Sequence, residues 1–140
     1  MQSFAYPCHV TQIAPEDFEV RFRDVPEAIT GGVTKEAALT EADDCLAAAI
    51  EGYIALKRPL PVPSAVQDGD TLVVLDWNVA ARALLADAMA QNKLSKSALA
   101  RRIGQDEKVV RRMLAGDGVK LEAILTALKQ LGLHPALSIG

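Results

Sequence analysis

Alternating hydrophobic and polar residues near the start of the chain predict β-strands there. In residues 18–23 the apolar side chains fall on one side and three charged side chains on the other, which is typical of a strand with one face against a core. Residues 3–13 predict a preceding strand, in which Pro7 marks an edge position or a bulge. A short third strand is expected at residues 28–30, ended by the glycines at 31–32.

A long helix is expected next, because the apolar residues then recur every three or four positions. From Lys35 to about Leu56 this spacing gives one apolar face, and acidic residues occupy the opposite face. Thr34 is the expected N-cap, although Ala37 stands where a reciprocal capping box needs Glu or Gln. Prolines then end the helix, and the apolar run at residues 71–75 predicts a covered strand.

The rest of the chain has a helical pattern throughout. Glycines and polar breaks divide it into expected helices over residues 79–91, 96–103, 107–114 and 121–131. Residues 135–139 could form a final short strand, which would need a partner strand to be stable. We expect that partner to be the same segment of a second copy.

These elements predict an α+β protein of two domains. Residues 1–77 would form a three- or four-stranded sheet with one helix on one face, and residues 78–140 an all-α domain. If the third and last strands were parallel, the connection between them would be a crossover. Residues 1–78 hold five basic and thirteen acidic residues, a balance of −8, whereas residues 79–140 hold ten and five, a balance of +5. The basic part suits a polyanion and the acidic part a basic partner.

The segment KSALARRIGQDEKVVRRMLAG, residues 96–116, predicts a helix-turn-helix of the phage-repressor type. Two short helices must cross steeply around a tight turn. Ala100 is small where they would approach, and Gly104 stands where the turn needs a positive φ angle. A plain helical hairpin is the alternative. The side chains expected to fill the shared core are Leu99, Ile103, Val110 and Met113.

The outward side chains of this segment have the chemistry to bind DNA. Arg and Lys can donate to guanine and Glu can accept from cytosine, while residues at the helix start and in the following loop would meet phosphates. A dimer that reads two half-sites about one helical turn apart is expected. A solvated basic face explains Arg101 and Arg102 at least as well. The DNA-binding candidates are Glu107, Lys108, Arg111 and Arg112 for bases, and Lys96, Ser97 and Lys120 for phosphates.

The sequence predicts neither a metal nor a cofactor. Cys8 and Cys45 lack the spacing of a zinc site or a disulfide framework, so we expect free, buried thiols. His9 and His134 are far apart and have no neighbouring ligands. Residues 1–14 lack a basic start followed by an apolar run, and no apolar stretch is long enough for a membrane span. We therefore expect a cytoplasmic protein with no membrane partner.

The order of these motifs resembles the HicB family of type II antitoxins, in the variant with a helix-turn-helix tail. FRDVPEAITGG at residues 22–32 is similar to the family's F-x-D-x-P-x-x-x-T-x-G. TKEAALTEADDCL at 34–46 and RPLPVPS at 58–64 follow it. The segments at 97–114 and 120–133 look like the family's repressor domain, so the resemblance covers nearly all of the chain.

The resemblance implies a partial ribonuclease-H-like fold for residues 1–77. It also implies binding of a small basic toxin, HicA, an mRNA-cleaving ribonuclease, and repression of the shared operon by a dimer or tetramer. The acidic balance agrees with a basic partner and would speed encounter, although ordinary solubility also explains it. Exposed strand positions are candidate toxin contacts, although a solvated strand face explains them equally well. They are Glu19, Arg21, Arg23, Asp24 and Glu27.

Two other functions remain open at this point. One is a stand-alone helix-turn-helix regulator whose N-terminal domain binds a ligand or oligomerises. The other is a nuclease of the ribonuclease H type. Such a nuclease needs clustered carboxylates to hold two magnesium ions, and one of these carboxylates lies on the first strand. The first expected strand carries no acid, and Asp17, Asp24 and Asp43 do not obviously converge. We therefore expect the chain not to be an enzyme.

Overall fold

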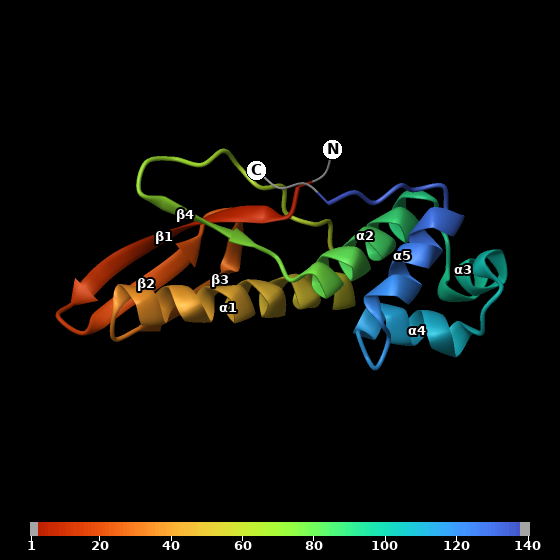
Figure 1. The fold of residues 1–140 in the computed structure, drawn as a ribbon, viewed down its shortest axis with the longest axis horizontal. Helices are drawn as coiled ribbons and strands as arrows, with labels where there is room; N and C mark the ends of the chain where they lie inside the picture. Colours follow the sequence, from red (N-terminus) through yellow and green to blue (C-terminus); the bar gives the residue numbers. More distant parts are fainter. Residues whose placement is uncertain (1–2, 138–140) are drawn as a thin grey trace. The chain divides into compact units, whose positions relative to one another are not determined.

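The computed structural model describes residues 3–137, which form an α+β protein as predicted (Figure 1). The described chain clusters into two compact units. The sheet unit holds the residues up to Tyr53 and the segment Leu60–Asp76, and the helical unit holds Ile54–Pro59 and the residues from Trp77. That these units act as separate functional domains stays a prediction.

The sheet unit contains a four-stranded antiparallel sheet. Its strands are β1 (Ala5–Ala14), β2 (Asp17–Phe22), β3 (Val25–Gly32) and β4 (Asp70–Val74), in the order β3-β2-β1-β4. Every neighbouring pair is antiparallel. The connection from β3 to β4 is therefore not a parallel crossover, which was expected only if these two strands ran parallel.

Pro7 lies in an inner strand rather than in an edge strand. It pairs with Leu72 of β4, but the pairing of β1 with β2 begins only at Cys8, so Pro7 has a strand partner on one side. The sheet tolerates a proline there because the missing N–H removes no bond on the unpaired side. The irregularity in β1 lies further on, between Gln12 and Ala14.

The expectation of a third strand limited to residues 28–30 was wrong, because β3 extends over eight residues and includes Gly31 and Gly32. A Cβ atom at Gly31 would lie 2.6 Å from the carbonyl oxygen of Phe18, and one at Gly32 would lie 2.6 Å from the amide nitrogen of Ala38. The two glycines therefore allow close approach of neighbouring backbone and do not end the strand.

One long helix, α1 (Lys35–Ala55), covers one face of the sheet (Figure 1). The Thr34 hydroxyl accepts a hydrogen bond from the amide of Ala37 at 3.0 Å, which confirms the predicted N-cap. The helix buries one apolar stripe against the sheet, and burial of that apolar area drives the packing. The fully buried side chains of this stripe are Ala38, Ala42, Leu46 and Ile50.

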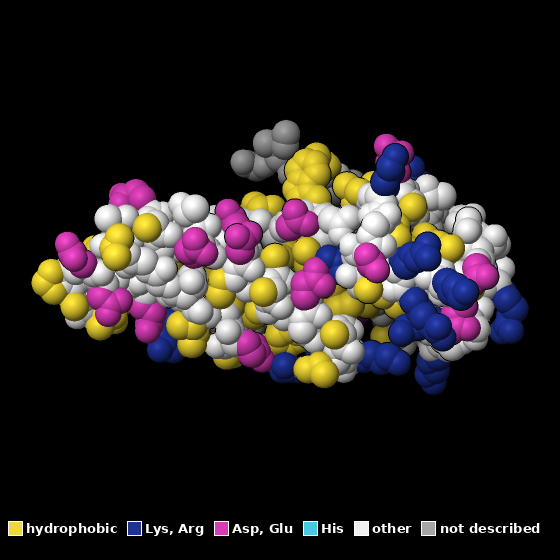
Figure 2. Space-filling view, turned by 90° about the horizontal axis from the view of Figure 1, so that it is seen from below, with side chains coloured by type: hydrophobic (Ala, Val, Ile, Leu, Met, Phe, Trp, Pro, Cys, Tyr) yellow, Lys and Arg dark blue, Asp and Glu magenta, His cyan; other side chains and the backbone are white. Residues whose placement is uncertain are grey.

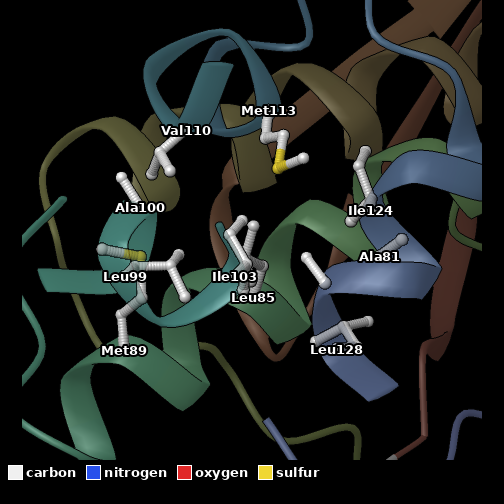
Figure 3. Close-up of a cluster of buried hydrophobic side chains, with 11 residues drawn as sticks. Ala81, Leu85, Met89, Leu99, Ala100, Ile103, Val110, Met113, Ile124 and Leu128 are labelled. Carbon is white, nitrogen blue, oxygen red and sulfur yellow. The ribbon is translucent and has the colours of Figure 1, made fainter. Parts of the chain in front are cut away.

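The helical unit consists of α2 (Trp77–Gln91), α3 (Lys96–Ile103), α4 (Glu107–Ala115) and α5 (Leu121–Gln130). Figure 3 shows their side chains meeting in one apolar cluster. The four residues predicted to fill the core between α3 and α4 are all buried in this cluster: Leu99, Ile103, Val110 and Met113.

The described end of the chain does not form the expected final strand. Residues 135–137 have no regular secondary structure, and the remainder of the expected strand lies outside the described residues. In the described part of the chain, no helix has both the length and the apolar character needed to cross a membrane.

Candidate nucleic-acid interface

Capping groups fix both ends of α3 and the start of α4, and a short turn joins the two helices. Ser95 accepts a hydrogen bond from the Ala98 amide at 3.1 Å and so begins α3. Gly104 ends it with φ 69°, in the left-handed region that favours glycine. Asp106 then accepts from the Lys108 amide at 2.9 Å and begins α4. The predicted role of Gly104 in the turn is therefore confirmed.

Two side chains anchor the inner face of α4. Val110 is fully buried and Met113 is nearly so, and both lie in the common core of the helical unit. Ala100 of α3 lies beside Val110, where a larger side chain would push the two helices apart (Figure 3). Val109 and Leu114 of α4 pack against the same core while partly buried, and the charged residues of α4 lie away from it.

The outer face of α4 carries three exposed cations, Lys108, Arg111 and Arg112. Glu107 lies on the same face and accepts a hydrogen bond from Arg111 at 2.8 Å, with 40% of the Glu107 side chain and 60% of the Arg111 side chain exposed. A surface pair of this kind contributes about 0.3–0.5 kcal/mol, so a polyanion could displace it at little cost. Figure 2 shows Lys and Arg side chains gathered on the surface of the helical unit.

The candidate phosphate contacts lie at two helix starts. Lys96 and Ser97 occupy the first turn of α3, where Ser97 is exposed and Lys96 is half-buried. Lys120 is exposed at the N-cap of α5, with no side-chain capping bond. Backbone N–H groups at helix starts favour anions, so a cation beside them adds to the same preference.

Glu19 and Arg21, two of the candidate toxin contacts, form an ion pair with each other on β2. The Arg21 side chain is 62% exposed, so this pair is accessible from solvent. Ile29 is the register partner of Arg21 on β3 and is itself exposed. This part of the sheet therefore presents a mixed apolar and charged surface.

The other three candidates make hydrogen bonds within the sheet unit. Arg23 donates to Ser64 at 2.8 Å and to the Asp70 carboxylate at 2.6 Å. Asp24 accepts from both the amide and the hydroxyl of Ser64 at 2.9 Å. Glu27 accepts from the hydroxyl of Tyr53 at 2.7 Å. Sequence reasoning missed these structural roles, because partners so distant along the chain leave no local pattern.

Two titratable groups respond to this packing. The guanidinium of Arg23, hydrogen-bonded to Asp70, lowers the pKa of that carboxyl. Burial, assisted by the nearby charge of Asp24, raises the pKa of Tyr6 from 10.0 to about 12. The Tyr6 hydroxyl also donates to the carbonyl of Pro61 at 2.8 Å, which ties the proline-rich segment to β1.

Both cysteines are free, Cys8 buried and Cys45 only half-buried, so the expectation of burial holds fully for the first alone. Burial raises the pKa of each thiol, which keeps them protonated and poorly nucleophilic. Among residues 3–137, no group of three or more His, Cys, Asp or Glu side chains is placed to hold a metal ion.

Comparison with known proteins identifies the family. A family model described as a HicB-like antitoxin of bacterial toxin-antitoxin systems matches residues 5–84. The chain belongs to the HicB-like antitoxin family. Antitoxin HicB 2 of Photorhabdus laumondii is 37% identical over 116 residues, which are 82% of each chain. Antitoxin HicB of Escherichia coli K12 is 32% identical over 128 residues, 91% of this chain and 93% of that one.

The similarity to these HicB antitoxins extends beyond the family match. An alignment that covers 91% of the chain must include most of the residues after 84, and these form the greater part of the helical unit. A third relative, Antitoxin HicB of Pseudomonas fluorescens, is 32% identical over 118 residues. The helical unit is therefore part of what this HicB-family chain shares with proteins named as antitoxins.

Proposed function

We propose that this HicB-family antitoxin neutralises a HicA-like, mRNA-cleaving toxin through its sheet unit and represses its own operon through the helical unit. In this scheme α3 and α4 form a helix-turn-helix, and α4 enters the major groove of operator DNA. The chain acts by binding alone and has no enzymatic step.

The proposal of DNA binding rests on α4, which has one side buried in the core and one exposed basic side. Val110 and Met113 fix one side in the core, and the opposite side presents Lys108, Arg111 and Arg112 to solvent. Arginine and lysine can donate to the O6 and N7 atoms of guanine, which lie at the floor of the major groove. The phosphate contacts would come from Lys96, Ser97 and Lys120 at the flanking helix starts.

The toxin-binding half rests on family membership and on charge. Residues 1–78 carry a balance of −8, which would attract a basic toxin and raise the rate of encounter. Of the proposed contacts, Glu19 and Arg21 are the more available, because their hydrogen bond to each other is exposed. Arg23, Asp24 and Glu27 would have to bind the toxin while they hold the sheet unit together.

The proposed DNA binding also requires that the chain associates with itself. A helix of nine residues makes few base contacts, so two copies that read two half-sites would be needed for specific binding. The assembly is proposed to be a dimer or a tetramer of the chain.

Co-expression with the small gene adjacent to its own gene tests the toxin-binding half. We expect the two products to purify together and the mixture to lack ribonuclease activity. A gel-shift assay with DNA from upstream of the operon tests the other half, with a coding fragment of equal length as control. Specific DNA binding without a co-purifying toxin would instead favour the stand-alone regulator.

A further inference from the structure

Arg82 of α2 is a charged residue in the core of the helical unit, with only 4% of its surface exposed. A buried charge is costly unless hydrogen bonds compensate its lost hydration. Its Nε donates to the side-chain oxygen of Asn78 at 2.8 Å, and its Nη1 donates to the carbonyl oxygen of Leu114 at 3.2 Å. The guanidinium therefore links α2 to the C-terminal end of α4.

This contact meets α4 where a helix needs a partner. The last carbonyl groups of a helix find no N–H donor within the helix. The C-terminus also carries a partial negative charge, so a cation there is stabilising. Leu114 is the penultimate residue of α4. Arg82 thus caps the C-terminus of α4, while Asp106 caps its N-terminus.

The loop after α4 is packed directly over the same guanidinium. A Cβ atom at Gly116 would lie 2.6 Å from Cζ of Arg82 and 2.9 Å from its Nη1. Gly116 has φ 74°, a backbone conformation that favours glycine, and a larger residue there would also displace the guanidinium. The loop that passes over Arg82 continues to Lys120, the proposed phosphate contact at the start of α5.

We propose that Arg82 is a positioning residue for the DNA-binding surface, which it never touches itself. The inference rests on the proposed function of α4. Val110 and Met113 are the buried residues of this nine-residue helix, with Val109 and Leu114 partly buried beside them, so contacts at its ends also contribute to its tilt. Base contacts tolerate displacements of only about 0.5 Å. Phosphate contacts through long side chains tolerate more, so loss of Arg82 should reduce specific binding more than non-specific binding.

The test compares Arg82→Met with Lys129→Met in the full-length chain. Both variants remove one positive charge from the helical unit, but Lys129 is exposed on α5 and belongs to no proposed contact. The probes are the tightest duplex selected by the wild-type chain from a random DNA library, and poly(dI-dC). We expect the ratio of specific to non-specific affinity to fall about tenfold in Arg82→Met, comparable to the loss of one base contact, and to stay unchanged in Lys129→Met.

A simple loss of folded protein cannot produce this result, because it would lower both affinities by the same factor. If Arg82→Met does not fold, Arg82→Lys keeps the charge but loses the planar fork that reaches two acceptors, and we expect a severalfold fall in the same ratio. A wild-type ratio in whichever variant folds would overturn the inference. A wild-type chain that selects no preferred duplex would overturn the proposed function instead.

Discussion

Arg23 and Arg111 are both arginines paired with a carboxylate near the surface, but their surroundings give them different roles. Arg23 donates to the side chains of Ser64 and Asp70, and the Asp70 side chain is only 3% exposed. Arg111 bonds an accessible glutamate one turn earlier on its own helix. The first arginine holds a loop in place, whereas the second can exchange its partner for a base edge at small cost.

Replacement of Arg111 by alanine should weaken specific DNA binding by about 1–3 kcal/mol, because one bidentate base contact is lost. Affinity for selected and random duplexes would be measured at the same salt concentration, since phosphate contacts make both depend on salt. Equal losses on the two duplexes would show that Arg111 contacts phosphate rather than bases. Lys129→Met is the matched control, and it should leave the preference for the selected duplex unchanged.

Replacement of Tyr6 by phenylalanine should change how stability depends on alkaline pH. Because folding raises the pKa of Tyr6 from 10.0 to about 12, its contribution is fully present below pH 10 and is lost as pH rises towards 12. In the variant this loss disappears, while the missing hydrogen bond to Pro61 costs about 0.5–1.5 kcal/mol at neutral pH. Urea unfolding at several pH values would measure both effects. An unaltered slope between pH 10 and 12 would contradict the assignment.

The sequence predicted the outward position of Arg111, because a helical period places it opposite Val110 and Met113. It did not predict the burial of Arg82, because the acceptor at Leu114 and the glycine at 116 lie more than thirty residues away. An arginine within an alanine- and leucine-rich helix was the available signal. Tertiary contacts of this kind leave no periodic trace in the local sequence.

At the scale of secondary-structure elements, the hydrophobic periods, the apolar run at residues 71–75 and the glycine and polar breaks located the strands and helices, but they did not give the extent of β3. Two consecutive glycines, such as those at 31 and 32, usually indicate the end of a strand in a sequence. Here the backbone around Phe18 and Ala38 lies too close for a Cβ atom, so glycine is needed within the strand. Local rules therefore predicted the existence of the element, and packing between elements decided its length.

Two glycines, one at the end of α3 and one within α1, should have opposite effects on stability when each is replaced by alanine. Gly104 has φ 69°, so Gly104→Ala should lower the free energy of unfolding by about 1–2 kcal/mol through backbone strain. Gly52 lies within α1 in open space, so Gly52→Ala should raise it by about 0.4–1 kcal/mol by restricting the unfolded chain. Thermal or urea unfolding of both variants would measure these changes. The same sign for both substitutions would contradict the argument.

At the scale of the whole molecule, the change of charge along the chain follows its division into two units. The acidic balance of −8 lies in residues 1–78 and the basic balance of +5 in residues 79–140, and the change comes close to Trp77, where the larger segment of the helical unit begins. Such a division allows one chain to attract two partners of opposite charge. The two proposed activities should therefore be separable by mutation.

The double variant Arg111→Ala/Arg112→Ala of the full-length chain should lose specific DNA binding and still purify with the toxin. Both residues lie on the exposed face of α4, so the fold should be retained. The reverse variant, Glu19→Ala/Arg21→Ala, should bind the toxin more weakly and keep wild-type DNA binding. Co-purification and gel-shift assays on both variants would measure this. Loss of both activities in either variant would contradict the division of roles.

The strand order β3-β2-β1-β4 has a consequence for how the chain is made. The first three strands are joined by short turns, but β4 begins at Asp70, 56 positions after β1 ends at Ala14. At translation rates of about 5–20 residues per second, one side of β1 stays without its neighbour for roughly 3 to 11 seconds on the ribosome. Hairpins form in microseconds, so the meander would exist well before the sheet is complete. The nascent antitoxin therefore passes through a stage in which β1 is an open edge, exposed to pairing with another chain until β4 covers it.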